Sequence, residues 1–167
     1  MKRTYSKEYP VPYRLKNKLF FPADIREETI GEDNDTQYSF IKFESVYNGK
    51  DLTDQDWLNS KSKELKKAVL ADLRWQRETA GITVNGRTIK TDRESQAKLT
   101  SAYTAAQINP MITINWKCED GWVSLNATEI KNIANAVIAH VQSCFNRENE
   151  LQDAINIDIN TDITTGW

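Results

Sequence analysis

Between residues 78 and 151 the sequence carries a dense set of local folding signals that agree with one another. Two tight-turn dipeptides, Asn85-Gly86 and Asp120-Gly121, are each flanked by apolar residues, which is typical of β-hairpins. Each is followed by a helix-start signature, Thr91-Asp-Arg-Glu94 after the first and Asn126 with Glu129 after the second. Since a sequence specifies one structure when its local signals agree, we expect the chain to fold around this segment.

A first helix is predicted just before this segment. Thr53 or Asp54 can cap its first turn, and Gly81 can adopt the left-handed conformation that follows a helix end, so we expect the helix to stop at Thr79-Ala80. Its apolar residues recur with helical spacing and form one stripe, made of Leu58, Leu65, Ala68, Val69 and Leu73.

The first hairpin has a definite predicted register. The pair Asn85-Gly86 favours a two-residue type I′ turn, because both central residues of that turn need a positive φ. A two-residue loop would pair Val84 with Arg87 and Ile82 with Ile89, so the apolar ends of the two strands would meet.

The second hairpin alternates apolar and polar residues from Met111 onwards, which is typical of a half-buried strand. A turn at Asp120-Gly121 would place Trp116 opposite Leu125 on the returning strand. The register of this hairpin therefore depends on where its turn lies.

Two more helices are predicted around these hairpins. The capping box at Thr91 opens one that runs through about Ile108 and stops at Asn109-Pro110. Asn126 caps the last helix, which spans roughly 40 Å at 1.5 Å per residue. Its apolar residues keep helical spacing: Ile130, Ile133, Ala134, Val137, Ile138, Val141, Cys144, Phe145, Leu151 and Ile155. The expected fold class is α+β, with the order helix, β-hairpin, helix, β-hairpin and long C-terminal helix, preceded by an extended aromatic N-terminal arm.

Residues 1–50 differ from the rest and are interpreted as an extended or β-type arm for docking on a partner. Three prolines in the first 22 residues favour extended backbone, and a strand is expected over residues 38–47 before a turn at Asn48-Gly49. An arm that packs on its own domain is the alternative. Residues 51–155 are expected to form the α+β domain, and residues 156–167 a C-terminal tail.

The candidate partner-binding residues are large aromatic side chains near the two ends of the chain, because such anchors dominate protein interfaces. The tail alternates Ile with Asn and Asp, so it is either a strand added to another sheet or a frayed end, and its terminal Trp favours docking. The candidates are Tyr9, Tyr13, Phe20, Phe21 and Trp167.

Composition narrows the function classes. The formal net charge is −2, so the chain lacks the basic excess usual in nucleic-acid-binding proteins. Its apolar runs are too short to span a membrane, and its N-terminus lacks the apolar core of a secretory signal. Cys118 and Cys144 are expected as free thiols, and a single histidine leaves no metal-ligand pattern, so no metal and no cofactor are expected.

The lysines of the first helix lie between its apolar positions and are interpreted as a solvated face. They are Lys61, Lys63, Lys66 and Lys67. If they form a phosphate-binding patch instead, the chain is a small regulatory or nucleic-acid-binding protein, which is the alternative hypothesis. Its affinity for DNA would then fall steeply with salt.

One pair of residues resembles a nucleophile with a base. His140 and Cys144 are four residues apart, within reach on one helix face. Their expected role is packing, because a nucleophile also needs an orienting acid and a cysteine on an apolar stripe is usually a small core residue. Asp92 and Glu94 are explained by capping, and residues 32–35 lack the glycine and distal glutamate of a calcium loop. The chain is therefore expected not to be an enzyme.

Five strings occur in order over roughly residues 70–155: Glu78-Thr-Ala-Gly-Ile-Thr-Val-Asn-Gly, Thr91-Asp-Arg-Glu-Ser-Gln-Ala, Asn115-Trp-Lys, Asp120-Gly-Trp and Ala139-His-Val-Gln-Ser-Cys-Phe. In these strings and their spacing the chain resembles an uncharacterised domain of tailed-phage proteins, which is encoded near tail-fibre genes and described as tail or tail-fibre-assembly-like. That family has no established activity, so the resemblance implies no catalytic residue.

The resemblance implies a non-enzymatic bacteriophage tail protein, made in the host bacterial cytoplasm and located in the virion tail. It would be a structural adaptor linked to the tail fibre or baseplate, or a tail-fibre assembly chaperone. Its partners would be other phage tail proteins, with a homo-oligomer as a further option, and neither membrane nor nucleic acid is expected. Residues 1–60 lie outside the resemblance, which suits attachment to a particular partner.

Overall fold

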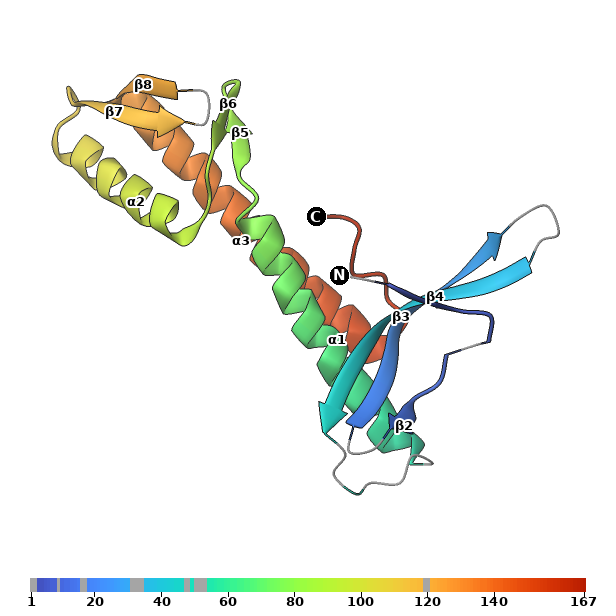
Figure 1. The fold of residues 1–167 in the computed structure, drawn as a ribbon. Coiled ribbons are helices and arrows are strands. Elements are labelled where there is room, and N and C mark those ends of the chain that lie inside the picture. The colour runs from blue at the N-terminus through green and yellow to red at the C-terminus, as the bar shows by residue number, and fades with distance from the viewer. Residues whose placement is uncertain are drawn as a thin grey trace. The chain divides into compact units, whose positions relative to one another are not determined.

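The computed structural model describes residues 3–8, 10–15, 18–30, 35–46, 49, 54–118 and 121–167 (Figure 1). Helices combine with small antiparallel sheets, so the α+β class is confirmed. In chain order the described elements are β1 (Thr4–Ser6), β2 (Tyr13–Leu15), β3 (Lys18–Ile30), β4 (Asp35–Val46), α1 (Gln55–Glu78), β5 (Ile82–Val84), β6 (Arg87–Ile89), α2 (Arg93–Ile108), β7 (Thr113–Cys118), β8 (Gly121–Asn126) and α3 (Ala127–Ile157).

Contacts within the chain define two compact units. Unit 1 comprises Met1–Ala71 and Asn149–Gly166, and unit 2 comprises Asp72–Glu148 together with Trp167. Both α1 and α3 contribute residues to each unit.

In unit 1, the four strands form an antiparallel sheet in the order β1-β4-β3-β2. Its centre is the long β3–β4 hairpin, whose register runs from Lys18 opposite Val46 to Ile30 opposite Asp35. The register shifts once, just after Ala23. Such an irregularity bends a strand pair and increases its twist.

This sheet comprises most of the residues that were expected to form an extended or β-type N-terminal arm. The strand predicted over residues 38–47 forms part of β4, although residues 47 and 48 lie outside the described residues. The pairing of β4 with β3, and of β3 with β2, was not predicted. Strand partners are set by contacts between distant residues, and Pro22 interrupts the alternation that would have marked β3.

The buried cluster of unit 1 joins this sheet to the first turns of α1. Leu19 and Phe21, two residues apart on β3, point to the same face of the strand and are both fully buried. They pack with Leu58, with Trp57 and Leu65 at the margin of the cluster. The rings of Phe21 and Trp57 have centroids 6.0 Å apart.

The α1 lysines expected to form a solvated face differ in their surroundings: Lys66 is buried, whereas Lys61, Lys63 and Lys67 are partly exposed. Lys66 is fully buried and donates to the carbonyl oxygen of Ile159 at 2.7 Å. Lys63 and Lys67 donate to the backbone and side-chain oxygens of Asn156, each at 2.6 Å. These acceptors lie at the C-terminal end of α3, where carbonyls lack helical partners and cations are favoured. The prediction was wrong for Lys66 because a lysine stripe does not reveal an acceptor far along the chain.

The C-terminal tail folds back onto unit 1. After α3 it has neither helix nor strand, and Ile163 is buried, so a frayed end does not describe it. Ile163 is only 1% exposed, while Ile157 at the end of α3 is 88% exposed. The apolar residues of this segment therefore have different surroundings despite their regular alternation in sequence.

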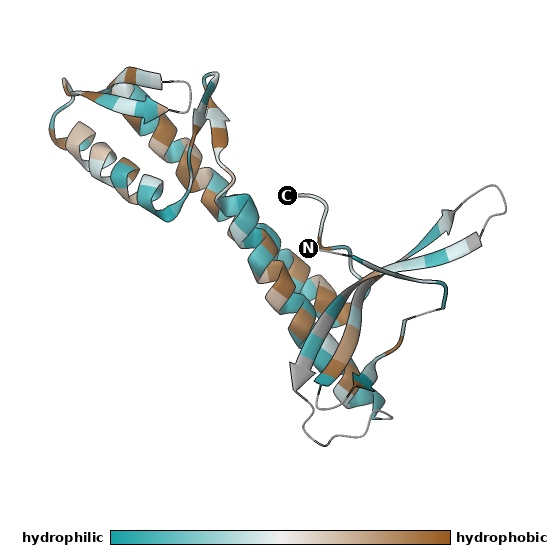
Figure 2. Cartoon of the chain, viewed as in Figure 1, coloured by the Kyte–Doolittle hydropathy of each residue, from teal (hydrophilic) through white to brown (hydrophobic). Residues whose placement is uncertain are grey.

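In unit 2, the two hairpins and α2 share one hydrophobic core with α3. Figure 2 shows hydrophobic residues recurring along α3, as its spacing predicted. The buried members of this core are Ile89, Leu99, Ala102, Ala106, Cys118, Leu125, Ala127, Ile130, Ile133, Ala134 and Val137. Residues from five elements meet here, so this core determines how the elements of unit 2 pack.

The predicted register of the first hairpin is confirmed. Val84 pairs with Arg87 and Ile82 with Ile89. The two turn residues, Asn85-Gly86, have φ values of 50° and 76°, as a type I′ turn requires.

The predicted register of the second hairpin is wrong by two residues, because its turn lies one position earlier than expected. Trp116 pairs with Val123, and Leu125 pairs with Ile114. Cys118 pairs with Gly121, which therefore opens β8 instead of occupying the turn. The two residues between them, 119 and 120, lie outside the described residues.

The helix caps agree with the predictions except at α2. Asp54 accepts a hydrogen bond from the Trp57 N–H at 3.0 Å, whereas the other candidate, Thr53, lies outside the described residues. The N-cap of α2 is Asp92, not Thr91. Asn126 caps α3 as expected. Its own N–H donates to Glu129 at 2.9 Å, which completes the predicted capping box.

Candidate functional site

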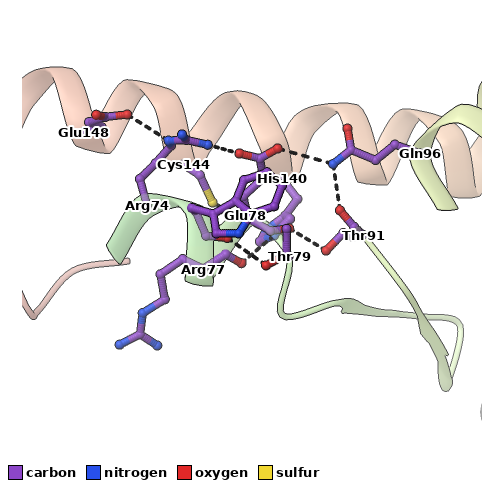
Figure 3. A network of polar contacts seen from close by, with 10 residues as sticks. Arg74, Arg77, Glu78, Thr79, Thr91, Gln96, His140, Cys144 and Glu148 are labelled. Atoms are coloured by element: carbon purple, nitrogen blue, oxygen red, sulfur yellow. Dashed lines mark hydrogen bonds and ion pairs between the residues drawn. The ribbon is translucent and has the colours of Figure 1, made fainter. Parts of the chain in front are cut away.

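A network of polar side chains in unit 2 surrounds the C-terminal end of α1 (Figure 3). At its centre Arg74 donates from Nε to Glu148 at 2.9 Å and pairs through Nη1 with Glu78. The Arg74 guanidinium also lies over the ring of Phe145, 4.5 Å from its centroid. The side chains of Arg74, Glu78 and Glu148 are 16%, 8% and 13% exposed, so water screens these charges only weakly.

The same network ties the end of α1 to the start of α2. Gln96 donates from Nε2 to the Glu78 carboxylate at 3.3 Å and to the Thr91 carbonyl at 2.7 Å. The buried Thr91 hydroxyl donates to the carbonyl of Glu78 and accepts from the N–H of Gly81 at 2.9 Å. Gly81 has φ +87°, and a Cβ there would lie 3.1 Å from the carbonyl oxygen of Ile89, so this turn requires glycine. Thr91 therefore bonds to the last residue of α1 and to the turn after it, instead of capping α2.

His140 of α3 also contacts the end of α1. Its Nε2 lies 3.2 Å from the carbonyl oxygen of Arg77 and 3.9 Å from the Cys144 sulfur (Figure 3). A carbonyl oxygen only accepts, so Nε2 carries the hydrogen in this contact. A protonated nitrogen cannot take a proton from the thiol, so His140 is not oriented as a base for Cys144.

The environment of Cys144 also disfavours a thiolate. Burial raises the pKa of this thiol above its ordinary value of 9.0, and the carboxylate of Glu78 raises it further. Reactive cysteines instead have a lowered pKa and an electropositive, accessible environment. The network therefore holds three secondary-structure elements together by hydrogen bonds and ion pairs, and its cysteine resembles a packed core residue.

The five aromatic residues predicted as partner anchors have different surroundings. Phe20 and Phe21 are 6% and 0% exposed in unit 1, so they pack on their own chain and are not exposed anchors. Tyr13 is 45% exposed, and its ring stacks on Phe20 at 4.9 Å. Trp167 is half-buried, and Tyr9 lies outside the described residues. The sequence pattern could not separate these cases, because burial depends on the unpredicted sheet.

The residues at the centre of the network were not identified from the sequence. Arg74 and Glu78 are four residues apart on one helix, a spacing that allows an ion pair. This spacing can be read from the sequence, but the same spacing is common on exposed helix surfaces and so does not indicate a buried pair. The contributions of Glu148 and Gln96 come from other elements, and no local pattern marks them.

The described part of the chain contains neither a cluster of metal-ligand side chains nor a helix suited to crossing a membrane. There, no group of three His, Cys, Asp or Glu side chains lies close enough together to hold a metal ion. Among the helices that the structure describes, none is long and apolar enough to cross a membrane. Cys118 and Cys144 are both buried thiols.

Comparison with known proteins gives one family. A family model described as "Domain of unknown function (DUF4376)" matches residues 61–165, from within α1 to the C-terminal tail. No curated protein matches the chain, and no solved structure matches it.

Proposed function

The chain belongs to the family described as a domain of unknown function (DUF4376), and from this premise we propose that it is a non-enzymatic protein of a bacteriophage tail. It acts by binding other tail proteins, either as a structural adaptor linked to the tail fibre or baseplate or as a tail-fibre assembly chaperone. It is made in the host cytoplasm and acts at the virion tail. The phage assignment is supported by the sequence resemblance over roughly residues 70–155.

The absence of enzymatic activity is supported by the bonding of the polar network. Arg74 pairs with both Glu78 and Glu148, and Gln96 and Thr91 bond to the ends of helices. A catalytic site instead keeps a nucleophile or base directed at a substrate. In this network the polar groups stabilise the fold.

A binding role is supported by aromatic and apolar side chains exposed on unit 1. Tyr5 and Tyr13 are 54% and 45% exposed, and Leu15 is 59% exposed. They lie on β1 and β2, the two outer strands of the sheet. Tyr13 and Leu15 lie two residues apart on β2, and exposed apolar residues close together on an edge strand are typical of a surface that another protein covers. Of the aromatic anchors suggested by the sequence, we therefore retain Tyr13.

The nucleic-acid alternative loses its main support. Lys63, Lys66 and Lys67 donate to oxygens of Asn156 and Ile159, so their ammonium groups are engaged within unit 1. A phosphate-binding patch requires such groups to face solvent.

The proposal is tested by mass spectrometry of particles purified from a phage that encodes this chain. Peptides of the chain in the tail fraction support the adaptor. A chaperone would be missing from particles but would co-purify with the fibre protein from infected cells. Absence from both preparations contradicts a tail function.

The role of unit 1 is tested by replacing Tyr13 with Ser in the full chain. Loss of an aromatic interface anchor is expected to weaken tail-protein binding by about tenfold or more. Met111→Ser is the matched control, because Met111 is 89% exposed and lies in unit 2. Equal binding by both variants would show that Tyr13 does not contribute to the interface.

A further inference from the structure

A groove of about 770 Å³ lies in unit 2 between β7 and α2. Five consecutive residues of β7, from Ile114 to Cys118, line it, whereas β8 contributes only Trp122. Consecutive residues of a strand point to opposite faces, so a groove lined by all five runs along the strand's edge and not across one face. The opposite wall is α2, which presents small side chains there, including Ser101 and Ala105.

The edge of β7 that borders this groove has unused backbone hydrogen-bonding groups. Cys118 and Gly121 are separated by only two residues, so they close the hairpin and exchange N–H and C=O bonds. Antiparallel strands alternate between bonded and non-bonded pairs, so Asn115 and Lys117 turn their N–H and C=O groups away from β8. Within the described part of the chain, β7 has β8 as its only strand partner.

The charged residues of the groove favour a guest that carries carboxylates. Its own carboxylates have partners: Asp92 accepts from the N–H and hydroxyl of Ser95, and Glu94 pairs with Lys98 at 2.5 Å. Lys90 is exposed and makes no ion pair with any residue that the structure describes.

Lys117 and Trp122 complete the wall of the groove. The Lys117 ammonium lies over the Trp122 ring at 5.9 Å, an exposed arrangement that leaves its charge accessible to a guest. Trp122 is itself 70% exposed. The groove thus combines an open strand edge, an exposed aromatic side chain and two accessible cations.

We propose that this groove binds an extended, acidic peptide segment of a partner protein, which adds to β7 as a third strand. The guest backbone bonds to the outward groups of Asn115 and Lys117. Its apolar side chains face Trp116 and the small residues of α2, and its carboxylates meet Lys90 and Lys117. Strand addition of this kind obtains affinity from main-chain bonds and specificity from alternate side chains. The surface is distinct from the unit 1 residues discussed above and does not depend on the phage assignment.

The probe is a blocked synthetic peptide of alternating valine and glutamate, seven residues long, titrated into the full chain. Binding is measured by calorimetry and by NMR shifts of the Asn115 and Lys117 amides. The same peptide with lysine for glutamate tests charge. A version methylated on alternate backbone nitrogens tests strand pairing. We expect both changes to weaken binding by about tenfold or more.

Two proline variants give a matched test of the edge. Asn115→Pro removes an outward N–H on the groove edge of β7, and Ser124→Pro removes the corresponding N–H on the far edge of β8, since these residues face each other. Neither change removes a bond between β7 and β8. Asn115→Pro is expected to weaken binding at least tenfold while Ser124→Pro leaves it unchanged. Circular dichroism checks that both variants keep their helices.

A third variant tests the groove itself. Ser101→Trp fills it from an exposed position on α2, and this should also abolish binding. Equal affinities of the two proline variants, stronger loss in Ser124→Pro, or no binding of the valine–glutamate peptide at millimolar concentration would overturn the proposal. Concentration-dependent self-association that Asn115→Pro abolishes would identify a second copy as the occupant and overturn it as well.

Discussion

At the scale of single residues, Arg74 has the most demanding environment in the network. It is a buried cation between two carboxylates, and its guanidinium covers the ring of Phe145. Such a group is tolerated only when its charge is compensated, because an uncompensated buried charge is strongly unfavourable. The residues around Arg74 should therefore be sensitive even to isosteric changes.

Replacing Glu78 with Gln should lower the free energy of unfolding by about 1.5–3 kcal/mol, because the charge-assisted hydrogen bond between Arg74 and the buried Glu78 carboxylate is lost. Glu94→Gln is the matched control. Glu94 pairs with Lys98 at the surface, where solvent screens the pair and the loss should be much smaller. Urea denaturation followed by circular dichroism measures both. Similar losses in the two variants would contradict the assignment of a buried, tightly coupled network.

The reactivity of the Cys144 thiol can be tested by alkylation. Its raised pKa leaves less thiolate at any given pH than an ordinary thiol has, so alkylation should be slow near neutral pH. The rate should keep rising with pH beyond the ordinary thiol value of 9.0, where that of an unfolded control levels off, and at pH 7.5 it should be lower than that of the control. Iodoacetamide labelling followed by mass spectrometry gives the profile. Fast labelling of Cys144 in the folded protein at pH 7.5 would return it to consideration as a nucleophile.

At the scale of elements, the C-terminal end of α3 is bonded to the lysines of α1. Three ammonium groups meet backbone and side-chain oxygens where helix carbonyls lack partners. A cation at a helix C-terminus also interacts favourably with the helix dipole. These bonds determine the path of the tail after residue 157.

Lys66→Ala should release this tail. A hydrogen bond from a charged group contributes roughly 1.5–3 kcal/mol, so amide exchange over residues 158–163 should accelerate by about tenfold or more. Lys61→Ala is the control, since Lys61 pairs with Glu64 on its own helix. Hydrogen exchange read by mass spectrometry resolves this segment. Unchanged exchange in Lys66→Ala would mean that the buried apolar residues alone hold the tail.

At the scale of the whole molecule, each unit contains a buried cluster whose residues all lie within that unit. The core of unit 2 and the whole Arg74 network lie within residues 72–148. The cluster formed by Leu19, Phe21 and Leu58 lies in unit 1. A domain with its own core can fold alone.

A fragment of residues 72–148 should therefore fold by itself. We expect helical circular dichroism, dispersed amide resonances and one cooperative thermal transition. The same fragment carrying Leu125→Ala is the control, because removing this buried side chain should cost about 2–5 kcal/mol. A fragment that lacks dispersed resonances at all temperatures would show that unit 2 depends on residues outside it.

The sequence by itself determined the features of this protein that depend on neighbouring residues. The turn at Asn85-Gly86, the capping box at Asn126 and the end of α2 at Asn109 were predicted because φ preferences and caps act within a few residues. The helical stripe of α3 was visible for the same reason, since burial repeats along one helix face. The α+β class followed from these local elements.

Only the tertiary structure decided which residues meet. Thr91 was predicted to cap a helix but bonds to the end of α1 instead. Lys66 was predicted to be solvated and Phe21 to be an exposed anchor, yet both side chains are buried. The four-stranded sheet and the bonds of Glu148 likewise join residues far apart in sequence. A side chain's own sequence neighbourhood specifies its backbone but not its distant partner, and burial, hydrogen bonding and charge pairing depend on that partner.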